Sequence, residues 1–297
     1  MSTSSSENRS HVQTAIWLAS YPKSGNTWVR IFLHNLMREL REQGEGAQSI
    51  NALHELTARD ALAAGFARRL GKPVAEATLR EIAQARTEVQ ADLAHGRKGP
   101  VYVKTHNAVA TIEGFPTINF DITLAAVYIV RNPLDVAVSY AHYSSLPAAK
   151  VIAFMANADA NIDVDPRRVY EFLGSWSFHA ASWMSVPHRP VLLVRYEDML
   201  ASPERTFGRL ASFLRLKPNA KQLSRAIEKS SFAEAASQEE RSGFTERPPT
   251  AGRFFRSGKA GQWREVLSQS EIEAVVRAHA PMMMRFGYLT EDCGWRG

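Results

Sequence analysis

The sequence predicts an α/β fold of three layers, with a central, mostly parallel sheet and helical insertions between the strands. Four short apolar segments, residues 15–20, 101–105, 124–130 and 191–195, are nearly continuous in hydrophobicity, as strands buried on both faces are. Stretches with helical periodicity separate them, and strands that alternate with helices favour a doubly wound sheet. Right-handed crossovers would bring the carboxyl ends of these strands to one edge, where ligands bind in such folds.

The helices after two of these strands have recognisable start signals. After the first strand, Pro22 and a polar turn lead into a predicted helix over residues 27–42. After the third strand, Asn132 precedes Pro133, which is an N-cap residue followed by proline at the first helical position. Both junctions therefore place a helix N-terminus at the ligand-binding edge.

The other segments are expected to be insertions in one domain. Residues 44–95 are Ala-rich and charged with a helical pattern, which predicts a helical cap insertion. Residues 144–175 suggest a loop and a short helix, and residues 237–261 have the Gly, Pro and charge content of a mobile loop. The polar, Ser-rich residues 1–12 predict a disordered tail. We expect residues 13–297 to form a single domain.

Composition restricts the classes of partner. The chain has 297 residues and carries 36 Lys and Arg against 30 Asp and Glu, a net charge of +6. This balance suits an anionic ligand without choosing between nucleic acid, anionic lipid and a small phosphorylated cofactor. Cys293 is the only cysteine in the sequence, so we expect no disulfide, no metal site and a reducing compartment. The polar N-terminus and the short apolar runs predict a cytoplasmic protein without a membrane segment.

The first strand ends in a turn that is suited to binding an anion. Lys23, Ser24, Gly25, Asn26 and Thr27 connect the strand to the helix, so main-chain N–H groups and the helix dipole would point at one spot. The glycine allows close approach of the backbone, the hydroxyls add donors and the lysine adds a charge. A Walker A loop would instead place the lysine directly before the hydroxyl residue at the helix start. The anion is therefore not specified by the loop alone.

Three further segments carry polar groups toward the same edge. Arg131 ends the third strand and could grip a phosphate through two N–H groups, or pair with Asp135 or Glu197 as a structural contact. Lys104 and His106 end the second strand, and the imidazole could act as a general base. The glycine-rich basic stretch at residues 256–261 could close over a second anionic group.

Together these segments resemble the cytosolic sulfotransferase family, which transfers a sulfuryl group from 3′-phosphoadenosine 5′-phosphosulfate (PAPS). The resemblance rests on YPKSGNTW at 21–28, KTH at 104–106, RNPLDVAVSY at 131–140, RYEDM at 195–199, SSF at 230–232 and RSGKAGQW at 256–263. These motifs extend over most of the chain, and their combination is highly specific. The resemblance implies a P-loop-like fold, a transferase that uses PAPS and releases 3′-phosphoadenosine 5′-phosphate (PAP), and no metal.

The resemblance also implies a role for each matching residue. His106 would take the proton from the acceptor, Lys23 would neutralise the leaving phosphate, and Lys104 would bridge to the transferring sulfuryl group. The 5′-phosphosulfate would lie in the cradle formed by Lys23, Ser24, Gly25, Asn26 and Thr27. The 3′-phosphate would be held by Arg131, Ser139, Arg256, Ser257 and Gly258. The adenine would be surrounded by Trp28, Tyr196, Ser230 and Phe232.

The sequence departs from the family pattern at three places. Asn26 stands where many members have Thr, although its amide can still form hydrogen bonds. Asn107 replaces the Leu-Pro that often follows the catalytic histidine, which leaves the local acceptor pocket undefined. Residues 264–268 lack the Lys-Thr-Val-Glu dimerisation signature of animal members, so the oligomeric state is open.

Other functions and the acceptor remain to be distinguished. A P-loop kinase using ATP conflicts with the position of Lys23, and a catalytically silent nucleotide-binding module conflicts with the retained Lys104 and His106. A nucleic-acid binder lacks clustered basic and aromatic stripes. We expect a small-molecule acceptor whose pocket is built from residues 44–95 and 144–175. Four apolar residues suggest that the acceptor is an aromatic or lipophilic alcohol, although they suit a hydrophobic core equally well: Phe154, Met155, Phe172 and Trp176.

Overall fold

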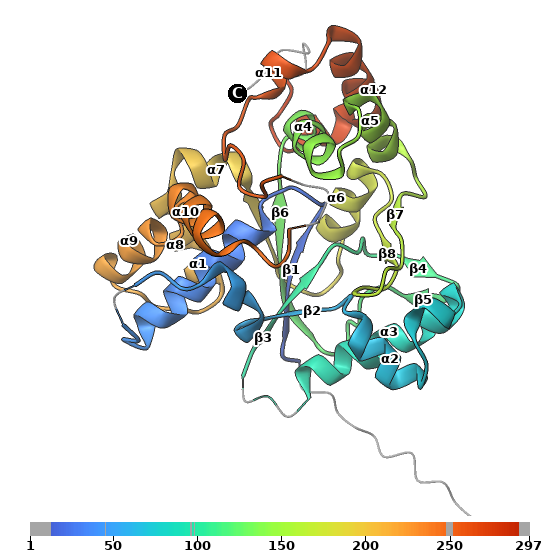
Figure 1. Ribbon diagram of the computed structural model, residues 1–297, viewed down its shortest axis with the longest axis horizontal. Helices are drawn as coiled ribbons and strands as arrows, with labels where there is room; N and C mark the ends of the chain where they lie inside the picture. The colour runs from blue at the N-terminus through green and yellow to red at the C-terminus, as the bar shows by residue number, and fades with distance from the viewer. Residues whose placement is uncertain (1–12, 45, 96, 98, 248–251, 291–297) are drawn as a thin grey trace, which may run out of the picture.

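The computed structural model describes residues 13–44, 46–95, 97, 99–247 and 252–290, and confirms the α/β fold. Its central sheet contains five parallel strands in the order β2 (Thr57–Arg59), β3 (Val101–Thr105), β1 (Ala15–Ser20), β6 (Thr123–Val130) and β9 (Val191–Arg195) (Figure 1). The expected tail at residues 1–12 and Cys293 lie outside the described residues.

Helices cover both faces of this sheet (Figure 1). They are α1 (Asn26–Leu40), α2 (Ala63–Leu70), α3 (Leu79–Ala94), α4 (Pro133–Ser144), α5 (Ala148–Ala156), α6 (Trp176–Met184), α7 (Tyr196–Ala201), α8 (Pro203–Phe213), α9 (Ala220–Glu228), α10 (Phe232–Ser242), α11 (Trp263–Val266) and α12 (Gln269–Arg285). Short 3₁₀ helices occupy Ile50–Glu55 and Val74–Glu76. The described helices include none with the length and apolar character needed to cross a bilayer.

Alternate residues of β1 face two different cores, which explains the continuous hydrophobicity of this strand. Trp17 and its neighbours on one face pack against α4, α5, α6 and α12. Ile16 and Leu18 on the other face pack against α1, α7, α8 and α9. Because side chains alternate along a strand, a strand between two helical layers must be apolar at every position.

The helix start signals are confirmed. The Asn132 side chain caps α4 by accepting a hydrogen bond from the Leu134 N–H at 3.0 Å, and Pro133 is the first helical residue. Helix α1 begins at Asn26, directly after Gly25, which has φ of 105°. Both N-termini lie at the carboxyl edge of the sheet.

The inserted segments contain strands that were not predicted from the sequence. Residues 44–95 include helices but also β2, an edge strand that extends the main sheet beside β3. Residues 144–175 hold α5 and the small antiparallel pair β7 (Asn161–Ile162) and β8 (Glu171–Phe172), while another such pair, β4 (Thr111–Ile112) and β5 (Phe115–Pro116), follows β3. The interval 237–261 starts within α10 rather than as a loop.

Candidate active site

A cavity of about 570 Å³ lies at the carboxyl edge of the sheet. The structure brings nearly all of the predicted site residues to its wall, although they are spread over much of the chain. The wall includes Lys23, Gly25, Asn26, Thr27, Trp28, Lys104, His106, Arg131, Ser139, Tyr196, Ser230, Phe232, Arg256, Ser257 and Gly258. Ser24 is buried and is the one predicted site residue that is not part of this wall.

The turn between β1 and α1 forms a cradle with unused donors. Lys23 and Gly25 both have positive φ, 67° and 105°, which curls the main chain around one point. A Cβ atom at residue 25 would lie 2.7 Å from the Tyr196 ring, so this close approach requires glycine. The Ser24 hydroxyl is buried without a hydrogen-bond partner among the described residues. An orphaned donor beside a helix N-terminus suits an anionic ligand.

The Lys23 ammonium is buried between two aromatic rings. Its Nζ lies 4.3 Å from the centroid of the Tyr143 ring and 4.3 Å from that of Phe254. Burial, followed by the nearby charges of Arg131 and Lys104, lowers the pKa of Lys23 to about 7. Such crowding of cations is unfavourable without an anion, so the site is organised to receive one.

Arg131 faces the same cavity and is bound to main-chain groups. Its guanidinium donates to the carbonyl oxygens of Lys23 at 3.3 Å and Lys259 at 2.9 Å, and it stacks over the Tyr196 ring at 4.3 Å. Its Nε is buried without a partner among the described residues. The structure therefore differs from the alternative in which Arg131 pairs with an acidic residue.

The two acidic residues considered as partners of Arg131 have other roles. Asp135 accepts hydrogen bonds from the Gly261 N–H at 2.7 Å and the Trp263 N–H at 3.3 Å. Glu197 accepts from the Asn132 N–H at 2.9 Å and the Tyr288 hydroxyl at 2.9 Å. The first contact anchors the glycine-rich basic stretch to α4, beside Arg131.

Asn26 uses its side chain differently from the predicted cradle contact. Its amide nitrogen donates to the Leu18 carbonyl oxygen at 2.8 Å and to the Ser20 hydroxyl at 3.3 Å. The amide thus ties the start of α1 back to β1. Because the Asn26 side chain is used in this way, only its main-chain N–H can be offered to an anion.

Beside the cradle, the cavity wall also offers aromatic and hydroxyl surfaces. Trp28 packs edge-on against Tyr196 with the ring centroids 5.6 Å apart. The Phe232 ring lies against Gly258, where a Cβ atom would approach it to 2.3 Å, so φ of 66° and the lack of a side chain are both required. Ser230 is buried nearby. These groups share the wall of the cavity.

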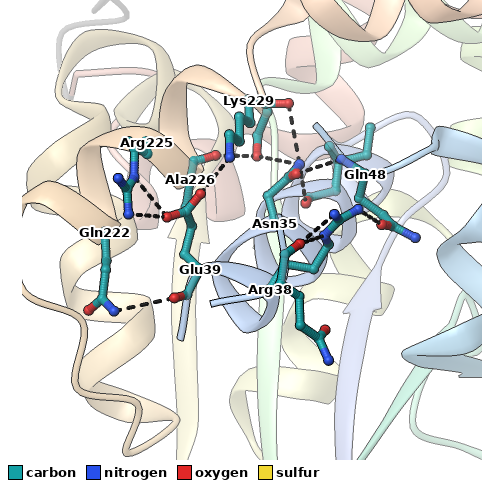
Figure 2. A network of polar contacts seen from close by, with 11 residues as sticks. Asn35, Arg38, Glu39, Gln48, Gln222, Arg225, Ala226 and Lys229 are labelled. Atoms are coloured by element: carbon teal, nitrogen blue, oxygen red, sulfur yellow. Dashed lines mark hydrogen bonds and ion pairs between the residues drawn. The ribbon is translucent and has the colours of Figure 1, made fainter. Parts of the chain in front are cut away.

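Figure 2 shows a polar network between α1 and α9 that includes Asn35, Glu39 and Lys229. The Asn35 amide donates to the Ser230 hydroxyl and to the Lys229 carbonyl oxygen, both at 3.3 Å. One turn further along α1, the buried Glu39 carboxylate accepts from Lys229 at 2.6 Å and Arg225 at 2.8 Å. These two cations lower the pKa of Glu39 although burial opposes the shift.

His106 is held as a neutral imidazole. Its Nδ1 lies 2.8 Å from the Ser20 carbonyl oxygen, and because a carbonyl can only accept, the proton is on Nδ1. The lone pair on Nε2 is therefore available. Burial, followed by the Lys104 charge, lowers the pKa of His106 well below its ordinary value. The His106 carbonyl oxygen accepts from His179 Nε2 at 3.0 Å, which fixes the main chain at this position.

Lys104 belongs to a buried ionic cluster that sequence reasoning missed. Its Nζ lies 3.8 Å from the Glu246 carboxylate, which also accepts from two nitrogens of the fully buried Arg30 at 2.8 and 2.9 Å. Burial lowers the pKa of Lys104 to about 8, although Glu246 opposes the shift. No local motif marks Arg30 or Glu246, since they are 216 positions apart in sequence.

The four apolar residues considered for the acceptor do not line the cavity. Met155 and Trp176 are fully buried in the core between the sheet and α12. Phe154 packs against Tyr140, and Phe172 packs against Phe178. The core interpretation therefore holds for Phe154, Met155 and Trp176, and none of the four residues bears on the chemistry of the acceptor.

Comparisons with known proteins identify the family. Residues 13–287 match the family model described as the sulfotransferase domain. Sulfotransferase 1B1 of Canis lupus familiaris is 26% identical over 274 residues, which cover 87% of this chain and 79% of that protein. Sulfotransferase 1A1 of Bos taurus is 24% identical over 284 residues, covering 90% and 82% of the two chains.

Solved structures show the same fold. Mouse sulfotransferase SULT7A1, complexed with PAP, has a TM-score of 0.58 at 20% identity, with 91% of this chain and 84% of that chain covered. Retinol dehydratase, in a complex with retinol and PAP, has a TM-score of 0.62 at 21% identity, with 96% and 84% covered. The motif resemblance is confirmed, and the chain belongs to the sulfotransferase domain family.

Proposed function

We propose that this sulfotransferase moves a sulfuryl group from PAPS to a hydroxyl or amine of a small molecule, with His106 as general base. The observation that carries the proposal is the convergence of an anion cradle and a neutral histidine in one cavity. Family membership supports the reaction class, and the similar structures of mouse SULT7A1 and retinol dehydratase contain PAP.

The residues present fit such a donor. Ser24 Oγ and Arg131 Nε are buried polar atoms without partners among the described residues, on either side of Lys23. Lys23, the α1 N-terminus and Arg131 supply positive charge where the phosphosulfate and the 3′-phosphate would lie. Trp28, Tyr196 and Phe232 on the cavity wall offer aromatic surface for the adenine.

Each polar residue of the cavity can have one role in the transfer. Bound PAPS supplies the activated sulfuryl group. His106 Nε2 takes the proton from the acceptor hydroxyl as the acceptor oxygen bonds to sulfur, and the sulfur–oxygen bond to the 5′-phosphate breaks. Lys23 and the cradle donors stabilise the charge that develops on the phosphate, and Lys104 stabilises the sulfuryl oxygens. The low pKa of His106 keeps it ready to accept a proton at neutral pH.

Calorimetry with nucleotides tests this proposal without knowledge of the acceptor. We expect PAP to bind much more tightly than ADP or ATP, because Arg131 would contact the 3′-phosphate. Arg131→Ala should weaken PAP binding by about 10- to 100-fold, the range for a lost hydrogen bond to a charged group.

Arg209→Ala provides the matched control, since this arginine is exposed on α8 and does not line the cavity. It should bind PAP like the native protein. Equal affinity for PAP and ADP, or a preference for ATP, would favour the kinase or silent-module alternatives instead.

A further inference from the structure

The cavity continues past His106 into a region that the donor does not need. Its wall there comes from the two inserted segments that were expected to form the acceptor pocket. The first contributes Arg59, and the second contributes Arg168 and Glu171, while Tyr140 and Tyr143 of α4 add two rings. Whatever receives the sulfuryl group must lie here, next to His106.

Arg59 reaches this region because β2 joins the main sheet. In the parallel register, Arg59 pairs with Lys104, so both side chains lie on the same face of the sheet. The following pair lies on the opposite face, where the Thr105 hydroxyl donates to the buried Asp60 carboxylate at 2.9 Å. The register therefore fixes Arg59 beside the proposed catalytic lysine.

The second insertion is bonded directly to the residues after β2. The Ala63 N–H donates to the Arg167 carbonyl oxygen at 3.0 Å, and the Val169 N–H donates to the Ala61 carbonyl oxygen at 2.9 Å. These bonds place Arg168 on the rim of the same region. The cationic rim is thus held by main-chain pairing rather than by flexible side chains alone.

The nearby carboxylates are already offset by other cations. Glu246 is shared by Arg30 and Lys104, and Asp165 pairs with Arg168 at 3.0 Å. In the described part of the chain, the guanidinium of Arg59 forms no hydrogen bond or ion pair.

Glu171 is also engaged. Its carboxylate accepts from the His106 N–H at 3.3 Å, and its charge faces the buried Arg86. Arg59 is a half-buried cation on this wall, and although its charge helps to lower the pKa of the nearby Glu246, its guanidinium has no direct partner among the described residues.

We propose that the acceptor is a compact hydroxylated molecule carrying an anionic group, a carboxylate or a phosphate, which Arg59 binds while its hydroxyl meets His106. The Tyr140 and Tyr143 rings support the body of the molecule. The inference rests on the proposed function, because it places the acceptor in the same cavity as the donor.

Paired acceptors that differ only in charge test this inference. One pair is 4-hydroxybenzoate and 4-hydroxybenzamide, and the other is glucose 6-phosphate and glucose, so the two pairs separate carboxylate from phosphate recognition. With PAPS as donor, we expect the anionic member of at least one pair to have the higher kcat/KM by about tenfold or more. Calorimetry of the same compounds with the PAP complex gives a second readout.

Variants at Arg59 show whether that residue is responsible. Arg59→Gln should raise KM for the preferred anion by about tenfold or more and leave neutral compounds and PAP affinity unchanged, while Arg59→Lys should retain part of the preference. Arg68→Gln, at an exposed position of α2, is the control and should behave like the native protein.

Three results would overturn the inference. The first is a preference for the neutral member of both pairs. The second is equal slowing of both members of a pair by Arg59→Gln, which would assign Arg59 to the sulfuryl group. The third is equal binding of every anionic probe to the native and the Arg59→Gln complexes with PAP. Failure of the proposed function would look different, because PAP itself would then not bind and no compound would be sulfated.

Discussion

The proposed donor and acceptor halves of the cavity are encoded in different ways. The donor half is made at strand–helix junctions, where Lys23 follows β1 directly and Arg131 follows β6 directly. The acceptor half depends on pairing between separate insertions, as in the bond from Val169 to Ala61. Local chain geometry is sufficient to orient the first set of groups, whereas the second set exists only after the insertions have folded together.

This difference predicts that the two halves can be disabled separately. His106 lies where they meet, but its side chain is fixed from the donor side by the Ser20 carbonyl oxygen. A substitution on the acceptor side that abolishes donor binding would contradict this separation of the two halves.

The largest expected effect is that of His106→Ala on turnover. Loss of a general base typically lowers the rate by about 10²–10⁴, and the substitution removes no group from the donor cradle. We therefore expect kcat to fall within that range while calorimetry gives an unchanged PAP affinity.

His95→Ala is the control for this substitution, since His95 is exposed at the end of α3 and does not line the cavity. Turnover of His106→Ala at the native rate would remove His106 from the mechanism. A large loss of PAP affinity would show instead that the two halves are not separable.

The same contrast explains how much could be predicted from the sequence. The four main strands and the helix starts were predicted because each depends on a contiguous pattern. The residues proposed to bind the donor were found on the cavity wall, and their roles stay predictions. Strand β2 was missed because Thr57–Arg59 is too short to show a periodicity within an Ala-rich helical segment. The Arg30–Glu246 pair was missed because nothing along the chain connects partners 216 positions apart.

Glu246 links the halves, and its removal should produce the next largest effect. Arg30 is fully buried, so Glu246→Ala would leave an unpaired buried cation and should lower the free energy of unfolding by about 3 kcal/mol. Denaturant unfolding at pH 7 measures this loss. Since Arg30 and Lys104 lower the pKa of Glu246, its stabilisation is present above the ordinary pKa of a glutamate and is lost as the pH falls toward the folded value.

The matched control is Glu240→Ala, which removes an exposed ion pair with Arg253. The Glu240 side chain is 72% exposed and that of Arg253 is 69% exposed. Exposed pairs contribute little, so the loss should be about 0.5 kcal/mol or less. Equal losses for the two variants would mean that the buried cluster does not stabilise the fold.

The smallest effect is a proton taken up when PAP binds. Lys23 has a pKa of about 7 because it is buried among cations, and the phosphates of PAP should raise it. At pH 7.5 the free lysine is mostly neutral and the bound one charged, so binding should take up roughly three-quarters of a proton. Calorimetry in buffers with different ionisation enthalpies measures this number.

Lys23→Met distinguishes the source of that proton. The variant should bind PAP more weakly and lose most of the uptake at pH 7.5, because Lys104, with a pKa of about 8, would contribute only a smaller uptake centred at higher pH. His106 should contribute little, because its lowered pKa leaves it neutral in the free protein at this pH. Proton release, or an uptake that survives in Lys23→Met, would contradict a donor half organised around a desolvated lysine. Groups in the acceptor half would then have to change their protonation when the donor binds. Two separately built halves do not predict such coupling.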